Sequence, residues 1–165
     1  MATKNYNLYL ASADKNSGDK NNNANFNVNW DSFLPRDFDT FQVTFNFNAS
    51  AGYYKDISNT TVYSHCRIVL DTQGRSFTYD TSNSGNSLTN TNGFNAFFGY
   101  NAPKTINRPT QNLINVKIYS IQGGTALVDT NLTGTLQTDM TPWVMTLSFI
   151  PVGTKPDNFP YVLNE

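Results

Sequence analysis

The segment 40–48 constrains the fold of this chain more than any other stretch of its sequence. Single polar residues separate four large apolar residues, which are Phe41, Val43, Phe45 and Phe47. Successive side chains of a β-strand point to opposite faces, so the four apolar side chains share one face. The pattern predicts a half-buried strand, and burial of its apolar face requires a second layer of structure.

Shorter versions of the same alternation recur along the chain and predict further strands. They lie at residues 6–10, 26–30, 61–71, 75–79, 113–121, 126–129 and 143–152. The polar stretch Ser12 to Asn25 predicts a long loop, because its glycine and asparagines tolerate turn conformations. The pair Gly123-Gly124 lies between two strand segments and predicts a hairpin.

The composition favours strands and turns over helices. The chain has 24 Asn and 11 Asp but only one Glu, and 14% of its residues are aromatic. A length of 165 residues fits one domain with its own core. We therefore expect an all-β fold, a single eight-stranded antiparallel jelly-roll sandwich over residues 1–152 with a C-terminal arm at 153–165. An immunoglobulin-like sandwich is the alternative, although its cysteine pair is missing.

The charge of the chain disfavours two classes of partner. The net charge is −1, only 14% of residues are charged, and the 11 basic residues are scattered. Direct binding of nucleic acid usually requires a cluster of basic residues, and the sequence contains no such cluster. No run of residues reaches the roughly 18 apolar positions that a membrane span needs, and the N-terminus has no hydrophobic signal core. A single cysteine, Cys66, permits no internal disulfide and fits a reducing compartment.

The residues that carry catalysis or bind metals are sparse. The one histidine, His65, is adjacent to Cys66 on a predicted strand, so their side chains point to opposite faces and do not form a nucleophile–base pair. Residues 14–19 have oxygen ligands at alternate positions, as a calcium loop does, but lack the downstream glutamate that completes such a loop. We expect no enzyme activity, no catalytic residue, no metal and no cofactor, with a hydrogen-bonded turn at residues 14–19.

A cluster of aromatic residues occupies a loop near the middle of the chain. It contains Phe94, Phe97, Phe98 and Tyr100, next to two glycines. Such rings plug one end of a sandwich, dock a partner or stack on a sugar, and the sequence leaves these alternatives open. The third alternative gives the chain a second candidate function, as a lectin-like carbohydrate-binding β-sandwich.

The order of residues at the N-terminus carries a resemblance. Leu8-Tyr9-Leu10 is followed by Ser12, Asp14-Lys15 and Gly18, then by Asn25-Phe26-Asn27-Val28, a proline-containing link and an alternating strand of Phe and Val. This order resembles the N-terminal region of single jelly-roll penton and minor capsid proteins of large eukaryotic double-stranded DNA viruses and virophages. The resemblance covers about a quarter of the chain. The chain departs from it in being short for a penton subunit, with no inserted outer domain.

The resemblance implies a structural role in an icosahedral shell. The chain would be a penton-type or minor capsid protein of the virion, made in the cytoplasm of the host cell. It would self-associate, most readily as a pentamer, and contact the major capsid protein. Closed symmetric assemblies of this kind use repeated contacts between subunits and need no active site.

We expect the assembly contacts on the N-terminal loop, the aromatic cluster and the C-terminal arm. The residues assigned to these contacts are Asp14, Lys15, Asn16, Asp19, Phe97, Phe98, Tyr161 and Leu163.

Overall fold

In a computed structural model of the protein, more than half of the described residues lie in β-strands. The described residues are 4–49, 53–55, 66–72, 76–81, 95–96, 102–121, 124–130 and 137–153. Their strands are β1 (Tyr6–Ala11), β2 (Asn23–Asn27), β3 (Thr40–Ala49), β4 (Tyr53–Lys55), β5 (Cys66–Asp71), β6 (Ser76–Asp80), β7 (Asn95–Ala96), β8 (Lys104–Asn107), β9 (Leu113–Ser120), β10 (Val128–Thr130) and β11 (Trp143–Pro151).

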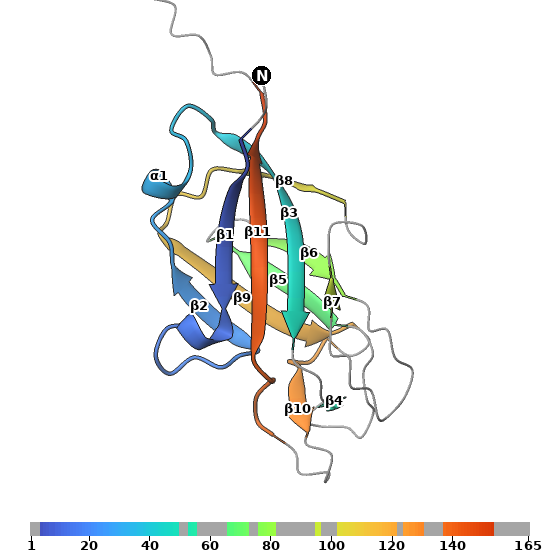
Figure 1. The fold of residues 1–165 in the computed structure, drawn as a ribbon. Coiled ribbons are helices and arrows are strands. Elements are labelled where there is room, and N and C mark those ends of the chain that lie inside the picture. Colours follow the sequence, from blue (N-terminus) through green and yellow to red (C-terminus); the bar gives the residue numbers. More distant parts are fainter. Residues whose placement is uncertain are drawn as a thin grey trace, which may run out of the picture.

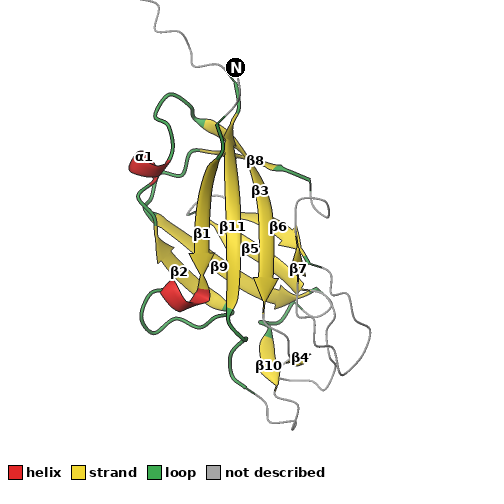
Figure 2. Ribbon diagram, in the orientation of Figure 1, coloured by secondary structure: helices red, strands yellow, loops and turns green. Residues whose placement is uncertain are grey.

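Two short helices accompany the strands (Figure 2). They are the 3-10 helix η1 (Ser12–Asp14) and the α-helix α1 (Trp30–Phe33). In the described ranges no helix has the length and apolar character needed to cross a membrane.

The strands form two antiparallel sheets that lie face to face, so the predicted all-β sandwich is confirmed (Figure 1). The first sheet has the order β1-β11-β3, with β7 and β8 both paired to β3. The second sheet has the order β2-β9-β5-β6. Strands β10 and β4 form a separate antiparallel pair at one end of the molecule.

The last strand, β11, is inserted between the first strand and β3. Its register with β3 runs from Trp143 opposite Ala49 to Pro151 opposite Phe41. On its other edge, β11 pairs with the whole of β1. The two ends of the described chain are therefore joined in the centre of the first sheet.

The core lies between the two sheets and contains the residues that the alternation predicted. Phe41, Val43, Phe45 and Phe47 of β3 are all buried. The ring of Phe45 stacks on Tyr79 of the second sheet with ring centroids 4.3 Å apart. The Tyr79 hydroxyl donates a 2.6 Å hydrogen bond to the Val43 carbonyl, so this buried polar group is satisfied. Burial raises the pKa of Tyr79 above its ordinary value.

The prediction for residues 26–30 was correct in burial and wrong in conformation. Phe26, Val28 and Trp30 are buried as expected. However, β2 ends at Asn27, and Trp30 begins the helix α1. The cause is the N-cap Asn29, whose side chain accepts a hydrogen bond from the Ser32 backbone N–H at 3.2 Å.

The predicted hairpin at Gly123-Gly124 forms only over a short distance. Gly124 has a φ of 64°, and Tyr119 makes an isolated bridge with Ala126. The next strand, β10, then leaves β9 and pairs with β4. A strand that the sequence did not predict, β8, pairs with β3 in the first sheet. Only Ile106 is buried in β8, and a single apolar position is too weak a pattern to predict a strand.

Some predicted features lie outside the described residues. They are positions 61–65 with His65, the aromatic residues Phe94, Phe97, Phe98 and Tyr100, and the arm after Gly153.

The outward faces of the two sheets differ in charge. On the first sheet, none of the described outward-pointing strand residues is charged, and we call this surface the uncharged face. Its residues are Asn7, Tyr9, Ala11, Thr40, Gln42, Thr44, Asn46, Asn48, Thr105, Asn107, Val144, Thr146, Ser148 and Ile150. The second sheet presents Arg67, Asp71, Asp80 and Lys117 on its outward side.

We expect the substitution Phe45→Asp to prevent folding. It places a carboxylate in the stacked centre of the core, where burial of an unpaired charge costs several kcal/mol, against a total stability of about 5 to 15 kcal/mol. Circular dichroism and soluble yield measure the effect. The control is Asn46→Asp on the adjacent outward position, which should fold normally. A folded Phe45→Asp protein with wild-type melting temperature would contradict the assigned core.

Candidate functional site

The loop between β1 and β2 is anchored to the segment that precedes β11. The hydroxyl of Ser12, which is buried, accepts a hydrogen bond from the Trp143 backbone N–H at 3.0 Å. The indole N–H of Trp143 donates in turn to the Asn21 carbonyl at 2.7 Å. Both ends of the loop are thereby fixed to the first residue of the last strand.

A single carboxylate, that of Asp139, holds the end of this loop that leads into β2. It accepts hydrogen bonds from the backbone N–H groups of Asn21 at 2.8 Å, Asn22 at 3.1 Å and Met140 at 2.7 Å. A hydrogen bond to an ionised acceptor is roughly twice as strong as one between neutral groups. Asp139 therefore links two segments that lie more than a hundred residues apart in the sequence.

The asparagine side chains of the loop complete the junction. The side-chain amide of Asn21 donates to the Met140 carbonyl at 2.7 Å, and that of the buried Asn22 donates to the Leu127 carbonyl at 2.8 Å. The consecutive asparagines thus bind backbone groups of two distant segments. The sequence showed their polarity but contained no signal for these partners or for Asp139.

Two of the predicted contact residues, Asn16 and Asp19, cover the outer edge of β2. The Asn16 N–H donates to the Asn25 carbonyl at 2.9 Å, and the Asn25 N–H donates to the Asp19 carboxylate at 2.7 Å. An uncovered edge strand presents unpaired backbone groups to other chains. At Asn25 the loop supplies those groups with partners from its own chain. Within the loop, the Asp19 N–H donates to the Asn16 carbonyl at 3.1 Å, so residues 16–19 contain a hydrogen-bonded turn.

The other predicted contact residues are placed as follows. Asp14 is exposed at the end of η1, and the half-buried Lys15 donates to the Ser12 carbonyl at 3.1 Å. Phe97, Phe98, Tyr161 and Leu163 lie outside the described residues. The structure thus brings together the four residues of the N-terminal loop.

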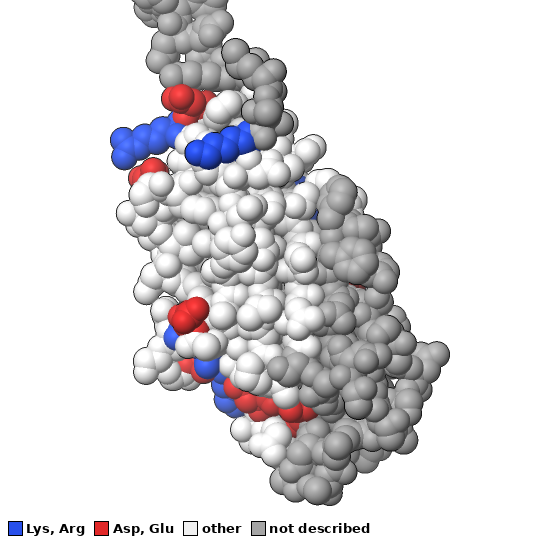
Figure 3. Space-filling view, viewed as in Figure 1, with Lys and Arg blue, Asp and Glu red and all other residues white. Residues whose placement is uncertain are grey.

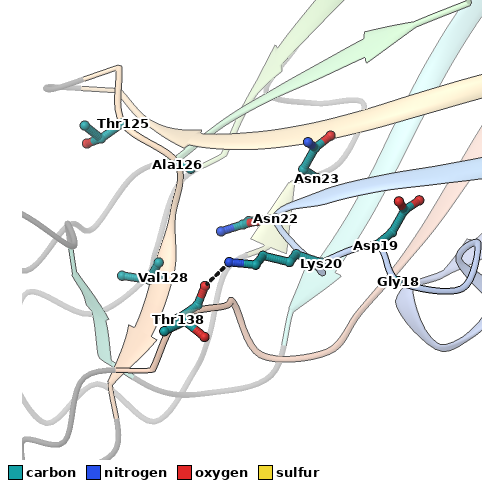
Figure 4. Close-up of a pocket in the computed structure, with 9 residues that line it drawn as sticks. All are labelled: Gly18, Asp19, Lys20, Asn22, Asn23, Thr125, Ala126, Val128 and Thr138. Carbon is teal, nitrogen blue, oxygen red and sulfur yellow. Dashed lines mark hydrogen bonds between the residues drawn. The ribbon is translucent and has the colours of Figure 1, made fainter.

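A shallow groove of about 490 Å³ lies beside this loop (Figure 4). One wall is formed by Gly18, Asp19, Lys20, Asn22 and Asn23, and the other by Thr125, Ala126, Val128 and Thr138. The ammonium group of Lys20 reaches across the groove and donates to the Thr138 carbonyl at 3.4 Å.

The charged groups of the groove are engaged by the protein itself. Asp19 accepts from the backbone of β2, and Lys20 spans to the opposite wall. General acid–base or nucleophilic catalysis needs a titratable group that is aimed at the substrate. In the parts of the chain that the structure describes, no group of three His, Cys, Asp or Glu residues is placed to hold a metal ion. The bonds of Lys20 and Asp19 join the two walls of the groove and connect the loop to β2.

The thiol of Cys66 faces the core. It lies 3.1 Å from the Thr81 hydroxyl and is completely buried. Burial raises its pKa from 9.0 to about 12, although the Thr81 hydrogen bond acts in the opposite direction. Since the thiolate is the reactive form, the folded protein keeps this cysteine inert.

Comparison with known proteins provides no assignment. No protein-family model matches the chain, and no curated protein and no solved structure matches it either. The functional argument therefore rests on the fold and the surfaces described above.

Replacing Asp139 should destabilise the fold by about 3 kcal/mol, because three backbone N–H groups lose a charged acceptor. The variant Asp139→Ala tests this by chemical denaturation. The matched control is Asp14→Ala, an exposed aspartate of the same loop region, which should change the free energy of unfolding by less than about 0.5 kcal/mol. Equal effects of the two substitutions would refute the role of Asp139 as an anchor.

Native Cys66 should fail to react with a thiol reagent at mildly alkaline pH and should react fully in concentrated guanidinium chloride. Between pH values of 9.0 and about 12, the unfolded chain releases a thiol proton that the folded chain keeps. The contribution of this group to stability therefore falls as the pH rises through that range. Rapid labelling of the folded protein would show that the cysteine is accessible.

Proposed function

We propose that this chain is a jelly-roll structural subunit of a virion, of the penton or minor capsid type, which self-associates within an icosahedral shell. The observation that carries the proposal is the order in which the strands pair. Eight strand positions are obtained when β7 and β8 are counted as one interrupted position beside β3 and the separate β4–β10 pair is set aside.

The pairs nest from the outside of the chain inward. Position one pairs with eight (β1 with β11), two with seven (β2 with β9), three with six (β3 with β7 and β8) and four with five (β5 with β6). Nested pairing of this kind arises when one long antiparallel hairpin is rolled into two sheets. Jelly rolls have this architecture of two Greek keys and are found in viral capsid and lectin domains. The fold alone does not select between those roles.

The edges of the sandwich support assembly by side-to-side contacts. The edge of β2 is covered at Asn25 by the N-terminal loop. By contrast, within the described ranges the backbone of β1 is bonded only to β11, so its other edge is open. An open edge strand is a template for pairing with another chain. A ring of subunits uses such a surface repeatedly and closes without an active site.

The carbohydrate-binding alternative depends on exposed aromatic residues. Phe97 and Phe98 lie outside the described residues, whereas Tyr9 of β1 is exposed on a face that carries Asn, Gln, Ser and Thr. Stacking on a sugar usually involves such a ring together with polar side chains. A glycan array separates the two functions, because a capsid subunit of this kind gives no glycan-dependent signal.

If the proposal is correct, the chain is present in purified particles and forms oligomers in light-scattering measurements at high concentration. Imaging of the particle should place it at or near a five-fold axis or between major capsomers. A strict monomer that is absent from purified particles would refute the proposal.

Two residues of the N-terminal loop, the exposed Asp14 and the half-buried Lys15, provide a sharper form of this experiment. The double substitution Asp14→Ala with Lys15→Ala should reduce incorporation into particles without changing the melting temperature by more than a few degrees. The control is Arg36→Ala, an exposed residue of the link between α1 and β3, near the opposite end of the sandwich (Figure 1). Equal incorporation of both variants would remove the loop from the assembly surface.

A further inference from the structure

The uncharged face differs from the outward side of the second sheet, which carries Arg67, Asp71, Asp80 and Lys117. Figure 3 shows it from the front, with charged side chains gathered at the two ends and none over the central strands. The residues on it are Asn, Gln, Ser and Thr, with a few apolar side chains among them. Solvent-exposed surfaces of small domains usually carry interspersed charges of both signs. A charge-free sheet face of this extent is therefore typical of a surface that meets another molecule.

The size of this face is that of a modest protein interface. Strands in a sheet are about 4.8 Å apart, and each residue adds about 3.4 Å of length. The 29 residues of β1, β3, β8 and β11 thus give a projected area of about 470 Å². Stable interfaces bury about 800 Å² per partner, and a corrugated surface exceeds its projection.

One end of the face has both an apolar projection and an apolar hollow. The side chain of Tyr9 is 73% exposed, and Val144 on the neighbouring strand is 56% exposed. Next to them lies a hollow of about 190 Å³, with Ala11, Ala13 and Pro142 among its lining residues. A cavity of about 150 Å³ is large enough for a benzene ring, so the hollow has room for one aromatic side chain.

These features match a second copy of the same surface. A projection and a hollow on one face are self-complementary under a two-fold axis, since each Tyr9 can enter the hollow of the other copy. A face without charge has no like-charge repulsion when it meets itself. The outward side of the second sheet is a poorer partner, because contact there would desolvate charged groups such as the Arg67–Asp80 pair and Lys117.

We infer that the uncharged face is a dimerisation surface, on which two copies of this chain pack face to face with Tyr9 as an apolar anchor. The inference deepens the self-association part of the proposed function and rests on it only in that respect. The face-to-face contact is separate from the side-to-side contact through the open edge of β1. The expected affinity is weak, with a dissociation constant on the order of micromolar, because the contact is smaller than a standard protein interface.

The test introduces a charge at the centre of the face. Thr146 lies on β11 between Tyr9 of β1 and Asn46 of β3. Thr146→Lys should raise the dissociation constant of the dimer by at least about tenfold in sedimentation equilibrium. The matched control is Thr78→Lys, a half-buried threonine on the outward side of the second sheet, which should leave the constant within about twofold.

Further variants keep the test decisive if Thr146→Lys does not fold. Gln42→Lys changes an exposed position of the same face, and Tyr9→Ala removes the proposed anchor. Both should weaken the dimer by at least about tenfold while the melting temperature stays close to that of the wild type. Mixing Thr146→Lys with Thr146→Glu protein should restore association, because opposite charges then meet across the interface. A mixture that remains dissociated would overturn the face-to-face arrangement.

Other outcomes separate this inference from the proposed function. A wild-type chain that remains monomeric at high concentration overturns the inference, and glycan binding that Tyr9→Ala abolishes would identify the face as a sugar site. A dimer that responds to Thr146→Lys in a chain absent from particles supports the inference and refutes the virion role. If the chain is present in particles and Thr146→Lys does not change its association, the virion role is supported and the inference is refuted.

Discussion

The fold depends above all on the insertion of β11 between β1 and β3. Without it, β1 has no backbone partner in the part of the chain that the structure describes, and β3 loses the strand that pairs with most of its length. The inner side of β11 also supplies Met145, Leu147 and Phe149 to the core. Because these contacts join the two ends of the chain, the entropy of closing a very long loop must be overcome before they form. Topologies dominated by such non-local pairings fold slowly, and this one cannot be completed until its C-terminal strand is available.

The junction ahead of β11 makes that insertion specific. A strand that shifts by one residue moves its apolar side chains to the outward face, so the register must be fixed. Trp143, at the first position of β11, is held by Ser12 on one side and by the Asn21 carbonyl on the other. Asp139, which lies four residues before Trp143, binds the backbone of the same loop at Asn21 and Asn22. Polar contacts at one end of the strand therefore act together with the alternation of the core residues.

Local patterns in the sequence predicted the strands, and distant partners were the part that they could not predict. The alternation of β3 and β11 identified their buried faces correctly, since period-two burial is a property of each strand alone. Strand β2 begins three residues earlier than expected. Asparagine has a low propensity for strands, so Asn23 and Asn25 were assigned to the loop. Their hydrogen bonds with Asn115 and with Asp19 outweigh that low propensity. The roles of Asp139 and Asn22 depend on residues more than a hundred positions away. No pattern of residue spacing predicts contacts over such distances. The helix cap at Asn29 could have been predicted, because asparagine is a preferred N-cap residue.

The two sheets divide the surface of the molecule between two environments. The second sheet has charged residues on its outward side and, at Asn25, an edge that the chain covers itself, both of which suit contact with water. The first sheet has an uncharged outward face and, among the described residues, no backbone partner on the outer edge of β1. Each of these features alone is compatible with a monomer, but an open edge exposes unpaired backbone groups that natural sheets usually protect with charge, proline or a covering segment. None of these protections is present within β1 itself, whose six residues are Tyr6, Asn7, Leu8, Tyr9, Leu10 and Ala11. Within the described residues, β6 of the second sheet also pairs on one edge only, with β5, so the edges do not distinguish the two sheets. The charge of their outward faces does, and a face without charge is the easier one to desolvate when another molecule contacts it.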